Sequence, residues 1–268
     1  MPLVSVITPT QAHNATHVRA LWRSLERQVL APGWEWEWLV QEDGTQPAVR
    51  ESLPDDPRIH YDALGVQLGG AATRNTALAR ARGDLIAGMD HDDYYQPGGL
   101  AMLVEPLADD PAVAWSCARI EWRNPDGTTW VKPDVYPPGR IEPGSIAETF
   151  VRSNDFPFPA AITTYRRLHL IAHGGWPAVA RSTDAALLAA FATRWRGVWV
   201  DRVAATYRRW PAQHTVQPAD IAIRDLPHVR GAIAQRLAAE HTLARQVSST
   251  SPGTTSRSSA RRPARDTV

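Results

Sequence analysis

Short apolar, β-branched runs alternate with segments of helical periodicity through the first 118 residues, and this alternation restricts the fold more than any other feature. Runs typical of buried strands occupy residues 4–8, 34–40, 59–61, 85–89 and 113–117. The second run, WEWEWLV, alternates strictly, which predicts a strand with one face partly exposed at its start. Helical spacing of apolar residues is found at residues 16–29, 71–81 and 96–107. The alternation predicts an α/β fold with a mainly parallel central sheet flanked by helices, in which ligands bind beyond the carboxyl ends of the strands.

The remaining residues have a less regular pattern. We expect a hairpin at 121–131, a loop at 132–144, strands at 160–165 and 198–200, and a helix at 183–193. A long helix is expected near the C-terminus, at 221–246. Residues 247–268 consist largely of Ser, Thr, Pro and Arg, which predicts a disordered basic tail.

Composition excludes several classes of protein. The net charge of +1 gives no general attraction for nucleic acid, and the single cysteine, Cys117, allows no disulfide within the chain. The N-terminus lacks the pattern of a signal peptide, and no run of about 18 apolar residues predicts a membrane span. We therefore expect a cytoplasmic protein without a transmembrane segment.

Three carboxylates follow the strand at residues 85–89 directly. Asp90 and Asp92 are two residues apart, so on extended backbone they project to the same side, while His91 points away. Paired carboxylates favour Mg²⁺ or Mn²⁺, whereas the glycine and glutamate of a calcium loop and the ligand pairs of a zinc site are missing. The alternative is a solvated turn in which Asp93 caps the following helix.

A Gly69-Gly70 pair precedes the helix expected at 71–81. It is compatible with a phosphate cradle, in which backbone N–H groups and a helix N-terminus face an anion, and equally with a flexible turn. It is neither the dinucleotide fingerprint nor a P-loop, because the third glycine and the Gly-Lys-Ser/Thr sequence are missing. Arg74, one turn into this helix, either adds positive charge beside a diphosphate or faces solvent.

Four separated segments together resemble family 2 glycosyltransferases of the GT-A fold. These are VSVITPT, EWLVQEDGT, DPRIHYDALGVQLGGAATRNTALARARGDLIAGMDHDDYYQPGGL and GGWPAVARSTDAALL. The resemblance implies a Rossmann-like nucleotide-sugar-binding half at residues 1–118, and an acceptor-binding and catalytic-base half of the same domain at 119–217. A C-terminal helix at 218–246 and the tail at 247–268 complete the expected organisation.

The resemblance also implies roles for individual residues. Asp184 matches the catalytic base and Trp176 an aromatic residue beside the acceptor. Asp90 and Asp92 match the DxD motif, which contacts the ribose and the diphosphate-bound Mn²⁺ or Mg²⁺. The other expected nucleotide-sugar contacts are Thr8, Pro9, Thr10, Asp43, Gly70, Arg74 and His91. By its position alone, Asp184 is equally well explained as an ordinary first-turn aspartate of an apolar helix.

The chain departs from the family pattern at three places. Glu42 stands where the family usually has the first of two aspartates, Gln11-Ala12 replaces a Tyr-Asn pair, and Thr183 precedes the base in place of an acidic residue. The first two departures put in doubt which nucleobase and which sugar the donor carries. The segment at 207–215, YRRWPAQHT, is expected either to close over the donor, with Arg208, Gln213 and His214 near a phosphate or the metal, or to be an ordinary surface loop.

The resemblance predicts an inverting, metal-dependent transfer of a sugar from a nucleoside-diphosphate donor, a UDP-sugar above all, to the hydroxyl of a sugar or small-molecule acceptor. A homo-oligomer is compatible with the sequence. One alternative is a sugar-nucleotide nucleotidyltransferase, but TPTQAHN after the first strand lacks the glycine-rich, basic loop that this reaction favours. The other is a non-catalytic nucleotide-sugar-binding module, against which the presence of both Asp92 and Asp184 argues.

Overall fold

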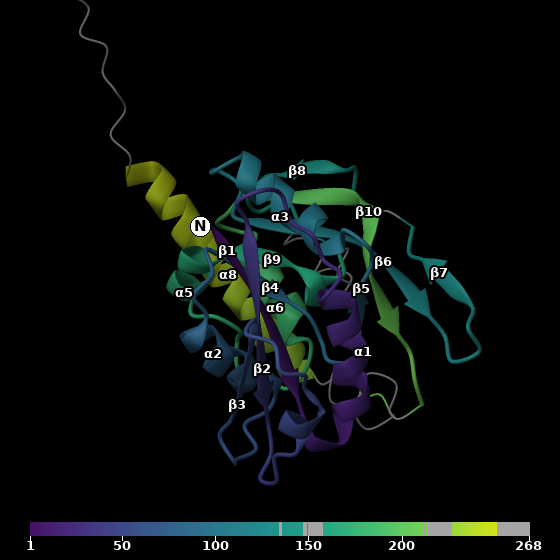
Figure 1. Cartoon of the computed structure of the whole chain (residues 1–268). Coiled ribbons are helices and arrows are strands. Elements are labelled where there is room, and N and C mark those ends of the chain that lie inside the picture. The colour runs from purple at the N-terminus through teal and green to yellow at the C-terminus, as the bar shows by residue number, and fades with distance from the viewer. Residues whose placement is uncertain (134–135, 147–148, 150–157, 212, 214–226, 251–268) are drawn as a thin grey trace, which may run out of the picture.

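A ten-stranded sheet forms the centre of the molecule, and helices cover both of its faces (Figure 1). The computed structural model describes residues 1–133, 136–146, 149, 158–211, 213 and 227–250. The strand order is β3-β2-β1-β4-β9-β6-β10-β5, with β7 added to β6 and β8 added to β10. The strands are β1 (Leu3–Thr10), β2 (Glu35–Glu42), β3 (Ile59–Ala63), β4 (Leu85–Gly88), β5 (Tyr94–Tyr95), β6 (Trp115–Arg123), β7 (Thr129–Val131), β8 (Gly139–Ile141), β9 (Thr164–Arg166) and β10 (Gly197–Arg208).

The expected α/β fold with a mainly parallel sheet is confirmed. The long pairings, β1 with β2 and β4, β2 with β3, and β6 with β10, are parallel. The antiparallel pairings are short, none longer than three residue pairs. Because β1 lies between β2 and β4, the carboxyl ends of these strands meet at one edge, where the direction of strand succession reverses. Ligand sites of open α/β sheets lie at such a point.

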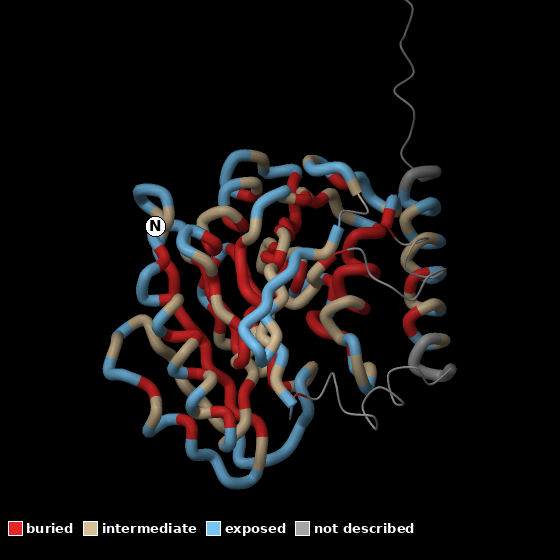
Figure 2. Tube along the Cα trace, turned by 90° about the vertical axis from the view of Figure 1, so that its right-hand side faces the viewer, coloured by how far each residue is buried: buried red, intermediate tan, exposed pale blue. Residues whose placement is uncertain are grey.

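The helices divide between the two faces. They are α1 (Ala15–Leu25), α2 (Gly70–Arg80), α3 (Gly99–Asp109), α5 (Arg167–His173), α6 (Thr183–Phe191) and α8 (Pro227–Thr250), with short 3₁₀ turns η1 (Ala12–Asn14), η2 (Val49–Ser52) and η3 (Ala160–Ile162). Apolar residues of α1 and α3 pack in one core, and those of α2, α5 and α6 pack in a second core on the opposite face. Figure 2 shows these buried segments on both sides of the sheet, with α8 on the outside of the molecule. Ile233 and Leu237 attach α8 to α6 in a third, smaller cluster.

Several element boundaries differ from those expected. α1 ends at Leu25 rather than near residue 29, and β6 and β10 run on to Arg123 and Arg208. β8 lies inside the expected loop at 132–144, and the expected strand at 160–165 is η3 followed by β9. α8 continues to Thr250, four residues into the expected tail, whereas residues 218–226 and 251–268 lie outside the described residues.

β2 is exposed at its first residue, Glu35, as the sequence predicts, and is buried on both faces from Trp36 onward. Glu37 is only 2% exposed because Ser5 and Arg82 supply hydrogen bonds to its carboxylate. Burial raises the pKa of Glu37, but these hydrogen bonds outweigh it and hold the pKa below its ordinary value. The strict alternation of the sequence therefore marks an ion-paired inner position and not a solvent face.

None of the helices in the described part of the chain combines the length and apolar character that crossing a bilayer requires. The sheet runs without interruption across the expected division between the two halves at residue 118, because β6 spans that point.

Candidate functional site

A cleft with two lobes opens at the edge where β1, β2 and β4 end. The strand-end lobe, of about 390 Å³, is lined by residues at or just after the ends of these strands, among them Pro9, Thr10, Asp43 and Asp92. The helix-side lobe, of about 700 Å³, is lined by residues 178–185 at the start of α6 and by residues around η3. Both lobes share Gly69, Gly70, Arg74, Asp90, Arg181 and Tyr207, so they form one continuous space.

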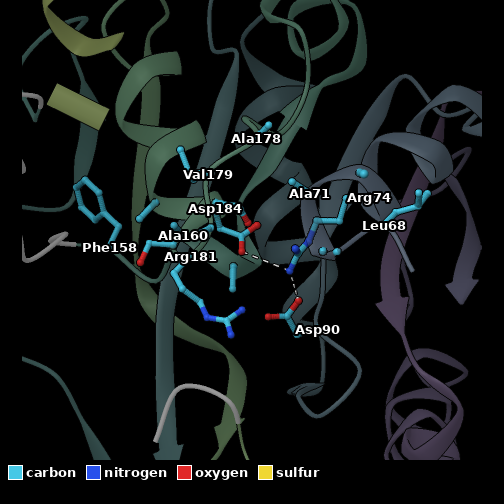
Figure 3. Close-up of a pocket in the computed structure, with 18 of the residues that line it drawn as sticks. Leu68, Ala71, Arg74, Asp90, Phe158, Ala160, Ala178, Val179, Arg181 and Asp184 are labelled. Atoms are coloured by element: carbon cyan, nitrogen blue, oxygen red, sulfur yellow. Dashed lines mark hydrogen bonds and ion pairs between the residues drawn. The ribbon is translucent and has the colours of Figure 1, made fainter. Parts of the chain in front are cut away.

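Arg74 lies at the centre of this cleft, between two carboxylates from distant parts of the chain (Figure 3). Its Nη2 is 2.5 Å from Oδ1 of Asp90 and 3.4 Å from Oδ2 of Asp184. Burial lowers the pKa of Arg74, but the carboxylates of Asp184 and Asp90 outweigh this and raise it. A Cβ atom on Gly70 would come within 3.1 Å of Nη1 of Arg74, so glycine at this position leaves room for the guanidinium.

Asp184 occupies the first turn of α6 and keeps 21% of its side chain exposed to the cleft. Trp176 donates a hydrogen bond of 2.8 Å from Nε1 to Oδ1 of Asp184. Ser182, just before the helix, has a φ of 59°, and no other non-glycine residue of the described chain has a positive φ. Left-handed backbone at a non-glycine residue is uncommon and concentrates at functional sites.

Trp176, which was expected beside the acceptor, is a buried neighbour of Asp184. Trp176 is 3% exposed and lines neither lobe. Asn75 on α2 holds its backbone twice, donating from Nδ2 to the carbonyl oxygen at 3.0 Å and accepting from the amide N–H at 2.9 Å. Trp176 therefore lies beneath Asp184 and orients its carboxylate.

Three aspartates follow β4, and each makes different contacts. Asp90 faces the cleft and pairs with Arg74; burial raises its pKa, Arg74 opposes that shift, and the carboxylates of Asp184 and Asp92 add to it. Asp92 accepts hydrogen bonds at Oδ2 from Trp210 Nε1 at 2.9 Å and from Gln213 Nε2 at 3.2 Å.

Asp93 is 1% exposed, lines neither lobe and accepts a hydrogen bond from the backbone N–H of Arg208. Burial, together with the carboxylates of Asp92 and Asp90, raises the pKa of Asp93 well above its ordinary value.

The donor set fits a divalent cation that also binds a ligand. Within the described residues no three histidine, cysteine or acidic side chains converge as a metal site made by protein alone would require. Asp90 and Asp92 nevertheless line the same lobe, and their described hydrogen bonds engage only Oδ1 of Asp90 and Oδ2 of Asp92. The two other carboxylate oxygens are hard donors of the type that Mn²⁺ and Mg²⁺ prefer.

The acidic residues after β2 hold loops in place. Asp43 lines the strand-end lobe and accepts hydrogen bonds from the backbone N–H groups of Leu68 and Gly69, at 2.5 and 3.1 Å. Gly69 has a φ of +82°, which favours glycine at this bend before α2. Glu42 is 2% exposed and accepts hydrogen bonds from Ala48, Val49 and the Tyr61 hydroxyl.

The residues at the end of β1 divide into two groups. Pro9 and Thr10 line the strand-end lobe. Thr8 lines neither lobe, because its side chain is fully buried and accepts a hydrogen bond from Trp38 Nε1 at 2.9 Å. Within the described chain, Thr10 Oγ1 and Asn14 Oδ1 are buried and have no hydrogen-bond partner.

The sequence pattern did not single out Arg181, which lines both lobes of the cleft. Figure 3 shows the Arg181 guanidinium directed toward the space beside Asp90. The arginine-rich composition gave this residue no distinguishing signal.

His91 lines the strand-end lobe with Nδ1 3.2 Å from the carbonyl oxygen of Pro9. In the segment at 207–215, Gln213 reaches Asp92, whereas His214 lies outside the described residues.

Curated proteins similar to this chain include two bacterial glycosyltransferases. One is TuaG of Bacillus subtilis (strain 168), which is named for teichuronic acid biosynthesis. The two chains are 35% identical over 132 residues, which is 47% of this chain and 50% of TuaG. The other is the UDP-Glc:alpha-D-GlcNAc-diphosphoundecaprenol beta-1,3-glucosyltransferase WfgD of Escherichia coli. It is 34% identical to this chain over 108 residues, which is 39% of this chain and 41% of WfgD. These matches span half or less of the length of the curated relatives.

Solved structures share the fold over most of the chain. Residues 1–349 of TarS of S. aureus, solved in complex with UDP-GlcNAc, give a TM-score of 0.61 at 18% identity, covering 92% of this chain and 74% of that fragment. The mannosyltransferase PcManGT from Pyrobaculum calidifontis in complex with GDP-Man and Mn²⁺ has a TM-score of 0.56 at 18% identity, covering 91% and 75%. The fold is thus that of GT-A structures.

The profile of one family, described as Glycosyl transferase family 2, matches residues 5–174. This range includes the ends of β1, β2 and β4, the glycine pair before α2 and the acidic residues after β4. It covers more than half of the 268 residues, so the chain belongs to glycosyl transferase family 2.

Proposed function

We propose that this protein transfers a sugar from a nucleoside-diphosphate donor to an acceptor hydroxyl, with inversion at the anomeric carbon. The observation that carries the proposal is the convergence of Asp90 and Asp184 on Arg74 where the two lobes meet. Family membership supports the reaction class. A UDP-sugar is the favoured donor, because TarS was solved with UDP-GlcNAc and WfgD is named for UDP-Glc.

The strand-end lobe is assigned to the nucleotide. Pro9, Thr10 and Asp43 line this lobe and are assigned to contact the nucleoside. Gly70, at the N-terminus of α2, exposes the helix end to the diphosphate. Asp90 and Asp92, with His91 beside them, complete this lobe.

Asp184 is assigned the role of general base in the helix-side lobe. Departure of the diphosphate gives the sugar oxocarbenium character, and the acceptor hydroxyl must lose its proton as it attacks. Trp176 and Arg74 hold the two carboxylate oxygens of Asp184 from different sides, which orients the base before the acceptor arrives. Attack from this lobe, opposite a diphosphate in the other lobe, inverts the configuration.

Asp90 and Asp92 would hold a divalent metal, Mn²⁺ or Mg²⁺. When bound, such an ion stabilises negative charge on a leaving diphosphate. Arg74 acts independently of the ion: its guanidinium keeps two carboxylates close together in the protein without ligand. PcManGT, with the same fold, was solved with Mn²⁺.

Thermal unfolding with UDP, GDP, CDP or TDP, each with and without Mn²⁺, tests the donor assignment. A ligand that binds only the folded state raises the midpoint, so UDP with Mn²⁺ is expected to give the largest shift. Stabilisation by another nucleotide would reassign the donor. No stabilisation by any nucleotide would remove the proposal.

A further inference from the structure

A second groove, of about 540 Å³, lies beside the residues that follow β4 and shares no lining residue with the cleft. Four arginines line it: Arg23 from α1, Arg27 just beyond the end of α1, Arg123 from the end of β6 and Arg208 from the end of β10. No aspartate or glutamate is among the described residues that line it. Figure 1 shows α1 beside the ends of these strands.

These four arginines lack the ion pairs that many other arginines of the chain form. Arg58, for example, pairs with Asp56 at 2.8 Å, and Arg82 pairs with Glu37 at 2.5 Å. Within the described chain, no carboxylate forms an ion pair with any of the four guanidinium groups of the groove. Like charges around one space repel one another, and a bound anion relieves that repulsion.

Neutral partners hold two of the four arginines in position. Arg123 donates from Nη1 to the Tyr94 hydroxyl at 3.2 Å, and the Arg208 guanidinium lies 5.8 Å from the centre of the Tyr94 ring. Arg208 also donates from Nε to the carbonyl oxygen of Asp92. These contacts order the guanidinium groups without neutralising them, so the groove is pre-organised for an anion.

We propose that the groove binds the phosphate or carboxylate groups of an anionic acceptor glycan. This inference rests on the proposed function for the existence of a glycan acceptor. Arg208 connects the groove to the cleft, because it lines the groove and contacts Asp92 and Asp93. Since the net charge is only +1, the attraction for an anionic chain is local to the groove.

The test is calorimetric binding of an oligogalacturonate, without nucleotide, to the full chain and to two double variants. Arg23→Gln/Arg27→Gln removes two groove charges, and Arg19→Gln/Arg50→Gln removes two exposed charges outside it. The groove variant is expected to bind about tenfold more weakly or worse, because two charge-assisted contacts are lost. The control variant is expected to bind as the wild type does, and all three proteins should unfold at similar temperatures.

Two further probes decide the class of ligand. A neutral cello-oligosaccharide of the same length is expected to bind the wild type more weakly than oligogalacturonate does. A single-stranded DNA of the same charge is expected to show the same reduction in affinity in both double variants, relative to the wild type. Equal binding of oligogalacturonate by the two double variants overturns the proposal, as does DNA binding at least as tightly through the groove.

The UDP and Mn²⁺ measurement separates the two proposals. If the wild type binds no nucleotide, the proposed function fails whatever the groove binds. If the groove variant binds UDP normally but not oligogalacturonate, both proposals stand. If it binds both normally, only the groove assignment fails.

Discussion

The indole N–H of Trp176 donates a hydrogen bond of 2.8 Å to Asp184, a carboxylate eight residues further along the chain. Arg74 approaches the other oxygen of the same carboxylate at 3.4 Å. Asp184 is thus fixed from both sides while part of its side chain still faces the helix-side lobe. A base held in this way needs little reorganisation when an acceptor hydroxyl arrives.

Replacing Trp176 with phenylalanine is expected to reduce kcat about ten- to hundredfold and to leave the donor KM unchanged. The change removes one hydrogen bond to a charged group, about 1.5–3 kcal/mol, and keeps most of the buried ring. Trp199→Phe is the matched control, because Trp199 is 5% exposed and its Nε1 has no hydrogen-bond partner in the described chain. Equal losses of kcat in the two variants would show that Trp176 acts only through packing.

Asp184→Asn is expected to lower turnover by about 10²- to 10⁴-fold, the usual contribution of a general base. Asparagine retains an oxygen that accepts the Trp176 hydrogen bond, so the fold around α6 is preserved. Binding of UDP with Mn²⁺, measured by calorimetry, should stay within a few-fold of the wild type. Turnover near the wild-type rate would exclude Asp184 as the base.

The strand ends could be predicted from the sequence because the pattern is local. Asp43 and Asp90 each follow a short apolar run, and the succession of strands and helices implies parallel order. With β1 between β2 and β4, their carboxyl ends necessarily meet at one edge. The cleft around Arg74 is therefore largely a consequence of local patterning and of strand order.

The depth of individual side chains could not be predicted, because it depends on partners far away in the sequence. Trp176 is buried by Asn75, 101 residues earlier, which binds its backbone twice. Thr8 turns inward toward Trp38 rather than outward toward the cleft. The alternation around Glu37 is typical of an exposed face, but Arg82, 45 residues later, supplies the charge that allows burial. No local pattern contains these pairings.

The Asn75 amide connects α2 to the segment before α6, so Asn75→Ala is expected to lower the free energy of unfolding by about 2 kcal/mol. Two hydrogen bonds are lost, and a backbone N–H and carbonyl of buried Trp176 are left unsatisfied. Urea unfolding measures the change. Thr76→Ala is the control, because Thr76 bonds only within its own helix, to the carbonyl oxygen of Ala72. A loss of stability no larger than that of the control would mean that solvent or another group replaces the two hydrogen bonds of Asn75.

Asp93→Asn is expected to change how stability depends on pH. Burial first, then the carboxylates of Asp92 and Asp90, raise the pKa of Asp93 in the folded protein well above 3.8. A raised folded pKa means that the folded state holds this proton more tightly than the unfolded state. The contribution of protonated Asp93 to the stability of the folded state is therefore fully present below about pH 3.8, and it is lost as pH rises through the folded pKa.

Asparagine cannot ionise, yet its oxygen still accepts the hydrogen bond from the Arg208 backbone. The stability of Asp93→Asn relative to wild type should therefore rise between about pH 4 and pH 7, as measured by urea unfolding at each pH. Asp55→Asn, at an exposed position, is the control variant measured over the same pH range. A relative stability that falls over the same range would mean that the folded protein favours the ionised form, with the positive charge of Arg208 outweighing burial and the neighbouring carboxylates.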